Sequence, residues 1–175
     1  MRILVTGGVR SGKSTHAEGL LGDEPATYVA AGPTPTAEDD PDWSARIAAH
    51  RARRPSTWTT VETQDLGPVV RDAMTPVLVD CLGTWLTAVI DAAGAWEAES
   101  DAVHALVLAR TDDLVDAIRG CGHDVVIVTN EVGLGVVPEH RSGRLFRDLL
   151  GLVNQRVAAA CDEVHLVVAG RVLRL

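Results

Sequence analysis

Aromatic residues are scarce in this chain of 175 residues, which holds one Tyr, one Phe and four Trp. Val, Leu, Ala and Ile must therefore supply most of the core. No apolar run approaches the roughly 20 residues that a membrane-spanning helix needs, so we expect no membrane span. Bases are also few, with 16 Lys and Arg against 24 Asp and Glu. The net charge of −8 argues against general binding of nucleic acid.

Cysteine is sparse as well. The three cysteines, Cys81, Cys121 and Cys161, form no C-x-x-C pair and are odd in number. Each stands near an apolar stretch, so we expect buried free thiols and a reducing, cytoplasmic setting. We expect no signal peptide, since the first predicted strand begins directly after Met1. The length predicts a single domain over residues 1–175.

A phosphate-binding pattern stands near the N-terminus. The apolar run ILV at residues 3–5 predicts a buried strand, and GGVRSGKS at residues 7–14 then matches G-x-x-x-x-G-K-[ST] without a mismatch. In this pattern backbone N–H groups cradle phosphates, Lys13 reaches the terminal phosphates and the Ser14 hydroxyl holds Mg²⁺. The helix that begins near Gly12 adds its positive end. A chance glycine-rich turn is the alternative, but the full match favours a nucleoside triphosphate site.

Apolar strands alternate with amphipathic helices along the rest of the chain. This order predicts an α/β fold with a mostly parallel sheet and helices on both faces. Three residues between the last two strands are too few for a parallel crossover, which predicts an antiparallel edge hairpin. The stretch 32–41, rich in Pro, Thr and Asp, predicts a loop. After the first strand, the predicted strands are 26–31, 57–62, 77–80, 125–128, 164–168 and 172–175, and the predicted helices are 13–21, 42–54, 82–93, 96–121 and 142–161.

The helix predicted over residues 42–54, with Asp42 as its N-cap, carries a basic face. Arg46, His50 and Arg53 stand at positions i, i+4 and i+7 and so share one side of the helix. A solvated basic helix is one interpretation. The other is a phosphate-binding face in which neighbouring cations keep His50 neutral, so that its imidazole can attack an α-phosphate. The spacing alone leaves both open.

Weaker signals lie elsewhere. Asp80 ends an apolar strand, where a P-loop protein places the acid that holds the Mg²⁺ water shell. Polar residues 129–131 follow another strand, at the sheet edge where α/β proteins bind ligands or as an ordinary connection. Arg141, Arg144 and Arg147 recur every three residues, which fits a solvated face, a substrate contact or a subunit contact. We assign no role to the histidines that show no metal-ligand pattern, His16, His104, His123, His140 and His165.

Four segments together resemble one known family. They are GGVRSGKSTHAE (7–18), RIAAHRARRPSTWTTVE (46–62), VDCLGTWLT (79–87) and VTNEVGLGVVPEHRSGRLFRDLLGLVNQRVAAACDEVHLVVAG (128–170). The family is the bifunctional adenosylcobinamide kinase/adenosylcobinamide-phosphate guanylyltransferase of cobalamin biosynthesis. The resemblance implies a P-loop fold of the RecA-like type, usually assembled as a homotrimer. It also implies phosphorylation of adenosylcobinamide by ATP or GTP, followed by transfer of GMP from GTP to that phosphate.

The resemblance also implies roles for individual residues. In the family, GMP passes through a histidine phosphoramidate, and the matching position here is His50. Lys13 is the second catalytic residue, and Ser14 with Asp80 holds Mg²⁺. Two other functions remain open from the residues alone, a single-activity P-loop small-molecule kinase and a non-catalytic nucleotide-binding switch. The implied nucleotide-binding residues are Gly7, Gly8, Val9, Arg10, Ser11, Gly12, Lys13, Ser14, Ala31, Gly32, Pro33, Arg51, Ala52, Arg53, Arg54, Glu62 and Leu82.

Overall fold

The computed structural model describes residues 1–33 and 41–175, apart from the side chains at positions 41–43, 46 and 50. The strands are β1 (Arg2–Gly7), β2 (Thr27–Ala30), β3 (Thr59–Glu62), β4 (Val77–Asp80), β5 (Val125–Val128), β6 (Glu163–Val168) and β7 (Arg171–Arg174). The helices are α1 (Lys13–Leu21), α2 (Pro41–Arg53), α3 (Leu66–Arg71), α4 (Leu82–Ala92), α5 (Ser100–Gly120) and α6 (Arg141–Ala158).

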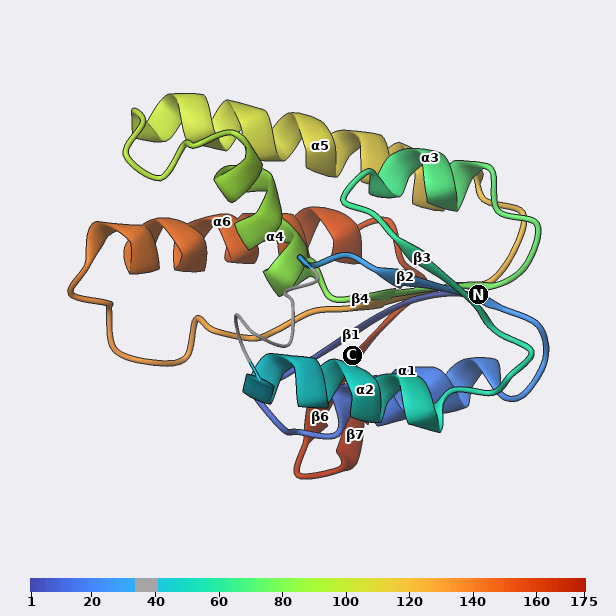
Figure 1. Cartoon of the computed structure of the whole chain (residues 1–175). Coiled ribbons are helices and arrows are strands. Elements are labelled where there is room, and N and C mark those ends of the chain that lie inside the picture. The colour runs from blue at the N-terminus through green and yellow to red at the C-terminus, as the bar shows by residue number, and fades with distance from the viewer. Residues whose placement is uncertain (34–40) are drawn as a thin grey trace.

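All seven strands lie in one sheet, in the order β3-β2-β4-β5-β1-β6-β7. Every neighbouring pair is parallel except β6 and β7, which pair antiparallel at one edge. Figure 1 shows α1 and α2 on one side of this sheet and α3 to α6 on the other. The predicted parallel sheet, edge hairpin and two helical layers are therefore confirmed.

The strands alternate their side chains between two cores because successive residues of a strand point to opposite faces. In β1, Leu4 packs into the larger cluster with α3 to α6. Its neighbours Ile3 and Val5 pack into a smaller cluster that includes Ala17 of α1. β4 and β5 alternate in the same way. Both faces of the central strands are thus buried, which is why their sequences read as continuous apolar runs.

The helix α3 was not predicted from the sequence. It spans six residues, which is too short for a helical period to stand out. Leu66 and Val70 are buried in the larger cluster beneath α5. A Cβ on Gly67 would lie 1.8 Å from the carboxylate of Asp113 in α5, so a larger residue there would require this side chain to move.

Several other expectations can be compared with the structure. All three cysteines are free, as expected. Cys121 is buried as expected, whereas the residues Cys81 and Cys161 are partly exposed, although burial raises the pKa of both of their thiols. Most of the predicted loop 32–41 and the proposed cap side chain of Asp42 lie outside the described residues. In the described parts of the chain, every helix is too short or too polar to cross a bilayer.

Candidate active site

A cavity of about 970 Å³, which includes space open to solvent, lies at the carboxyl ends of β2, β3 and β4. Ala30, Glu62 and Asp80 are the last residues of these strands and pair in register, so they stand at one level of the sheet. Open α/β sheets bind ligands at this edge. The residues that line the cavity are Val9, Lys13, Ser14, Tyr28, Ala30, Gly32, Pro33, Ile47, Arg51, Arg54, Thr60, Glu62, Asp80, Cys81, Thr84 and Asn130.

The phosphate loop joins β1 to α1. Gly12 precedes α1 with φ 96°, a left-handed conformation that glycine adopts without strain. Space also requires glycine at position 7, because a Cβ there would lie 2.4 Å from the carbonyl oxygen of Val167. The loop is held from outside by two backbone hydrogen bonds, from Glu131 to Gly7 and from Gly170 to Ser11. A short loop of fixed shape therefore leads into the N-terminus of α1, as an anion site needs.

Lys13 begins α1 and is buried, with 6% of its surface exposed. Its Nζ lies 3.2 Å from the carbonyl oxygen of Gly8, to which it donates a hydrogen bond. Ser14 follows it and lines the same cavity. A buried ammonium group and a hydroxyl at a helix N-terminus form a site suited to phosphate groups.

Asp80 lines the cavity from the end of β4. It accepts a hydrogen bond of 3.4 Å at Oδ2 from the hydroxyl of Tyr28 in β2. Beside it, the Thr84 hydroxyl donates to the carbonyl oxygen of Cys81, 3.0 Å away. Burial, and then the charge of Asp80, raise the pKa of the Cys81 thiol. The thiol is therefore a protonated, unreactive part of the cavity wall.

The oxygen donors at this edge fit magnesium. Ser14 offers a hydroxyl and Asp80 a carboxylate, and both line the cavity. Mg²⁺ prefers oxygen ligands and commonly takes one or two from the protein and the rest from water and substrate phosphates. These two residues could therefore hold a Mg²⁺ ion that arrives with a nucleotide.

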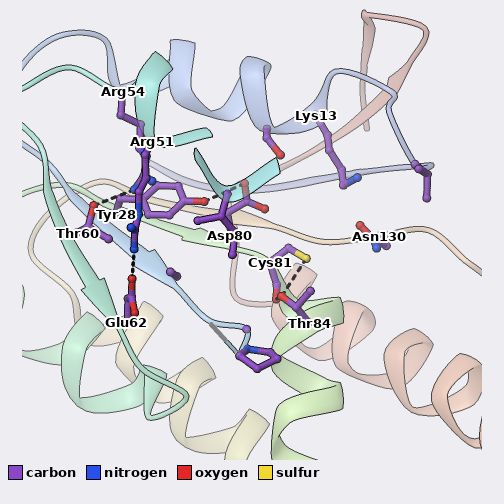
Figure 2. Close-up of a pocket in the computed structure, with 16 residues that line it drawn as sticks. Lys13, Tyr28, Arg51, Arg54, Thr60, Glu62, Asp80, Cys81, Thr84 and Asn130 are labelled. Atoms are coloured by element: carbon purple, nitrogen blue, oxygen red, sulfur yellow. Dashed lines mark hydrogen bonds and ion pairs between the residues drawn. The ribbon is translucent and has the colours of Figure 1, made fainter. Parts of the chain in front are cut away.

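The helix α2 closes the cavity on another side. Ile47 and Arg51 stand four residues apart on one face of α2, Arg54 directly follows the helix, and all three line the cavity. Arg51 forms an ion pair with Glu62 at the end of β3. The guanidinium carbon of Arg54 lies 3.8 Å from the centre of the Tyr28 ring. In Figure 2 these arginines lie on one side of the site and Lys13 on the other.

The basic stripe predicted on α2 is only partly described. Arg53, one of its members, pairs with Glu18 of α1, at 3.2 Å, which ties the two helices together. His50 belongs to α2, three residues after Ile47 and four before Arg54. The side chains of His50 and Arg46 lie outside the described residues. The hypothesis of a histidine nucleophile therefore stays a prediction.

The cavity brings together many of the residues predicted from the sequence. Those that line it are Val9, Lys13, Ser14, Gly32, Pro33, Arg51, Arg54, Glu62 and Asp80. The predicted residues that do not line it are Gly7, Gly8, Arg10, Ser11, Gly12, Ala31, Ala52, Arg53 and Leu82. Leu82 and Ala31 are fully buried in the larger core cluster. The sequence patterns did not predict that Tyr28, Ile47, Thr60 and Thr84 line the cavity, since nothing in their local sequence distinguishes them.

The three arginines at the start of α6 hold main-chain carbonyl groups. Arg141 donates to the carbonyl oxygens of Trp96 and Ala98. Arg147 donates to those of Gly135, at 3.0 Å, and Gly133, at 2.9 Å. Arg144 likewise donates to the carbonyls of residues 138 and 139. These residues therefore shape the loops that precede α5 and α6, a role that none of the sequence interpretations included.

Two further histidines form a hydrogen-bonded chain beneath the phosphate loop. His16 Nε2 lies 2.9 Å from His165 Nδ1, and His165 Nε2 lies 2.9 Å from Glu163 Oε2. Because a carboxylate only accepts, His165 donates to Glu163 through Nε2–H. The chain ties α1 to β6. Within the described residues, no group of three or more His, Cys, Asp or Glu could hold a metal ion.

The fold is also found in a solved structure. An ATPase from the type III secretion system of pathogenic bacteria superimposes with a TM-score of 0.57, covering 94% of this chain and 50% of the ATPase chain. The two sequences are 11% identical, so this likeness shows the fold alone.

The sequence itself matches known proteins along almost its whole length. The chain is 45% identical to the bifunctional adenosylcobalamin biosynthesis protein CobU of Salmonella typhimurium and 44% identical to that of Escherichia coli, covering 97% of each chain in both pairs. It is 36% identical to the bifunctional adenosylcobalamin biosynthesis protein CobP of Pseudomonas aeruginosa, of which it covers 94%. A family model described as cobinamide kinase / cobinamide phosphate guanyltransferase matches residues 3–175. The chain therefore belongs to the cobinamide kinase / cobinamide phosphate guanyltransferase family.

Proposed function

We propose that this chain is a bifunctional transferase of cobalamin biosynthesis that runs both reactions at the cavity described above. It phosphorylates adenosylcobinamide with ATP or GTP and then transfers GMP from GTP to that phosphate. One domain, residues 1–175, carries both activities. The main support is that Lys13, Asp80, Arg51 and Arg54 line one cavity although they come from three separate segments. Family membership supplies the identity of the substrate.

The chain's residues have distinct roles in the proposal. Lys13 neutralises charge on the phosphates of the bound nucleotide, as a buried cation at the loop can. Ser14 and Asp80 hold Mg²⁺, which supplies charge neutralisation and orientation of the phosphates when bound. Arg51 contacts the nucleotide from α2, and Arg54 contacts it from the residue that follows this helix. The other members of the predicted nucleotide site are proposed as contacts made through the phosphate loop, the end of α2, the end of β3 and the segments after β2 and β4.

His50 is the proposed nucleophile. Its imidazole nitrogen attacks the α-phosphorus of GTP, a P–N bond forms, and the bond from that phosphorus to the β-bridging oxygen breaks to release pyrophosphate. A phosphate oxygen of adenosylcobinamide phosphate then attacks the same phosphorus. The P–O bond forms, the P–N bond breaks, and the imidazole is regenerated. The position of His50 on α2, between two residues that line the cavity, supports this role.

The proposal extends to the setting of the enzyme. We propose that it acts in the cytoplasm, where its three free thiols would stay reduced. We also propose a homotrimer with adenosylcobinamide and its phosphate as substrates, and no nucleic-acid partner. The resemblance of the sequence to its family is the reason for the trimer, and sedimentation equilibrium measures it directly.

Incubation with α-labelled GTP tests the reaction. We expect the label to become attached to the chain through a bond that is labile to acid and stable to base, and to be lost in His50→Ala. Phosphorylation of adenosylcobinamide without labelled protein would favour a single-activity kinase. Tight binding of nucleotide without any product would favour a non-catalytic switch. His123→Ala is the control, because it removes an exposed histidine that does not line the cavity, and it should keep the label.

A further inference from the structure

Tyr28 is the one tyrosine of the sequence and lies in the wall of the cavity. It stands in β2, between Thr60 of β3 and Leu78 of β4 in the sheet register. Its side chain is 5% exposed and belongs to the smaller core cluster. It is therefore held by neighbours on two strands and in the core.

The hydroxyl of Tyr28 contacts the carboxylate at the end of β4. It donates to Oδ2 of Asp80 across 3.4 Å. A phenol O–H donates, and a carboxylate only accepts, so the two groups match as hydrogen-bond partners. The contact restricts the orientation of Asp80, which is the carboxylate proposed to face the metal ion.

The ring of Tyr28 contacts a cation that follows the end of α2. The guanidinium carbon of Arg54 lies 3.8 Å from the ring centre, which is well within the range of a cation–π contact. Arg54 also donates to the hydroxyl of Thr60 across 2.9 Å. Figure 2 shows the Tyr28 side chain extending between Arg54 and Asp80. One rigid side chain thus touches two charged groups that arrive on different elements.

We propose that Tyr28 is a positioning residue that fixes Asp80 through its hydroxyl and Arg54 through its ring. This inference rests on the proposed function, in which Asp80 serves the metal ion and Arg54 serves the nucleotide. A tyrosine side chain has two rotatable bonds, and here its ring is packed, so it sets the separation of the carboxylate and the guanidinium at little cost in side-chain entropy.

Two substitutions separate the two contacts. Tyr28→Phe removes the hydroxyl and keeps the ring, whereas Tyr28→Leu removes both. The affinity for GTP is measured by titration calorimetry without Mg²⁺ and over a series of Mg²⁺ concentrations. For Tyr28→Phe we expect an unchanged affinity without Mg²⁺ and a Mg²⁺ requirement raised by about tenfold, since a hydrogen bond to a charged group is lost. For Tyr28→Leu we expect the same rise together with an affinity lowered about threefold to tenfold without Mg²⁺.

Trp58→Phe is the matched control, because it trims another buried aromatic of the same cluster that does not line the cavity. Its nucleotide affinity should equal that of the unchanged protein at every Mg²⁺ concentration. Thermal melting of each variant reports whether it folds, and Tyr28→Phe keeps the shape of the ring. An unchanged Mg²⁺ requirement in Tyr28→Phe, or an equal loss of affinity with and without Mg²⁺, would overturn the inference.

The experiment also separates this inference from the proposed function. Calorimetry follows nucleotide binding, whereas guanylylation is followed by labelling the unchanged protein with α-labelled GTP. Absence of label on the unchanged protein would contradict the proposed function. A labelled protein whose Tyr28→Phe variant behaves as Trp58→Phe does would contradict the positioning role alone.

Discussion

The amine of Lys13 lies 3.2 Å from the carbonyl oxygen of Gly8, within the loop that it serves. A nucleotide phosphate would draw the same amine into a charge-assisted hydrogen bond, which is stronger than one to a neutral carbonyl. Lys13→Ala should therefore weaken GTP binding by about tenfold to a hundredfold. Titration calorimetry measures the change, and circular dichroism confirms that the variant is folded.

The sequence offers a second test of Lys13, because it is the only lysine in the chain. An amine-selective acylating reagent can therefore modify only Lys13 and the N-terminal amine, which pairs with Asp124 at 2.8 Å. We expect GTP to slow modification of Lys13 and to leave the N-terminal amine unaffected, as peptide mass spectrometry would show. Equal protection of both amines, or of neither, would contradict a phosphate contact at Lys13.

The ion pair between Arg51 and Glu62 should matter for binding and little for stability. Both side chains are about half exposed. Exposed pairs contribute roughly 0–1 kcal/mol, so Arg51→Ala should change the free energy of unfolding by less than about 1 kcal/mol. Its affinity for GTP should fall several-fold, because Arg51 also lines the cavity. Chemical denaturation and calorimetry measure the two quantities.

Arg110→Ala is the matched control for Arg51→Ala. Arg110 forms a similarly exposed pair with Asp65, and it does not line the nucleotide cavity. This variant should leave GTP affinity unchanged. If Arg110→Ala lost as much affinity for GTP as Arg51→Ala, the loss of one positive charge anywhere on the protein would explain the effect, and the position of Arg51 in the cavity would not.

Removal of Arg147 should loosen the loop between β5 and α6. Its guanidinium donates to two carbonyl oxygens, those of Gly133 and Gly135. Hydrogen exchange at residues 132–137 should become faster in Arg147→Ala, and also in Arg147→Lys, because an ammonium group lacks the forked geometry that spans two carbonyls. The free energy of unfolding should fall by about 1–3 kcal/mol for the two bonds.

Arg156→Ala serves as the control on the same helix. Arg156 lies in the last turn of α6, at the other end of the helix from this loop, and pairs with Asp112 on the protein surface. Exchange in that loop should match the unchanged protein. If exchange in Arg147→Lys stayed as slow as in the unchanged protein, a forked guanidinium would not be needed to hold the two carbonyls.

The pair of His16 and His165 predicts how stability depends on pH. Burial, and then the charges of His165 and Arg174, lower the pKa of His16 in the folded protein. As the pH falls through about 6.5, His16 binds a proton in the unfolded chain, whereas in the folded protein it stays neutral to lower pH. The free energy of unfolding therefore falls as the pH drops below about 6.5. Above that pH the stability from this residue is fully present. Urea denaturation from pH 7.5 to 5.5 measures the slope.

His16→Asn should flatten this slope, since it removes the group with the lowered pKa. The pKa of Glu163 is lowered from its ordinary value of 4.5, chiefly by the hydrogen bond to His165. Glu163 therefore changes its charge below pH 4.5, outside the range of the urea measurement. His123→Asn removes an exposed histidine and should keep the slope of the unchanged protein. Equal slopes in the unchanged protein and His16→Asn would contradict this origin of the pH dependence.

Much of the fold could be predicted from local patterns. The buried strands β4 and β5 were predicted with the bounds that the structure has, because both faces are covered and their sequences are uninterrupted runs of apolar residues ending at a polar group. The edge hairpin followed from the length of its turn. The six-residue helix α3 was missed because its stability comes from packing on α5, and a fragment this short carries no clear period.

The part of the candidate site that belongs to a contiguous motif was predicted from the sequence, whereas the place of Tyr28 in the cavity was not. Lys13 and Ser14 belong to a contiguous motif, and the geometry of a single loop determines their role. Tyr28 had no such motif, because its contacts to Asp80 and Arg54 join residues 52 and 26 positions away in the sequence. Arg53 shares a predicted face with His50, yet it pairs with Glu18, since α1 lies beside α2.

The sequence by itself determined the phosphate loop, the alternation of strands and helices, the single sheet and the family, because each is written in neighbouring residues or in the similarity of the whole chain. The tertiary structure alone decided which residues share the cavity and which arginines hold carbonyl groups. It also decided that one buried phenol joins a carboxylate to a guanidinium. The physical reason is that these contacts depend on strand order and helix packing, which bring together side chains that no local spacing relates.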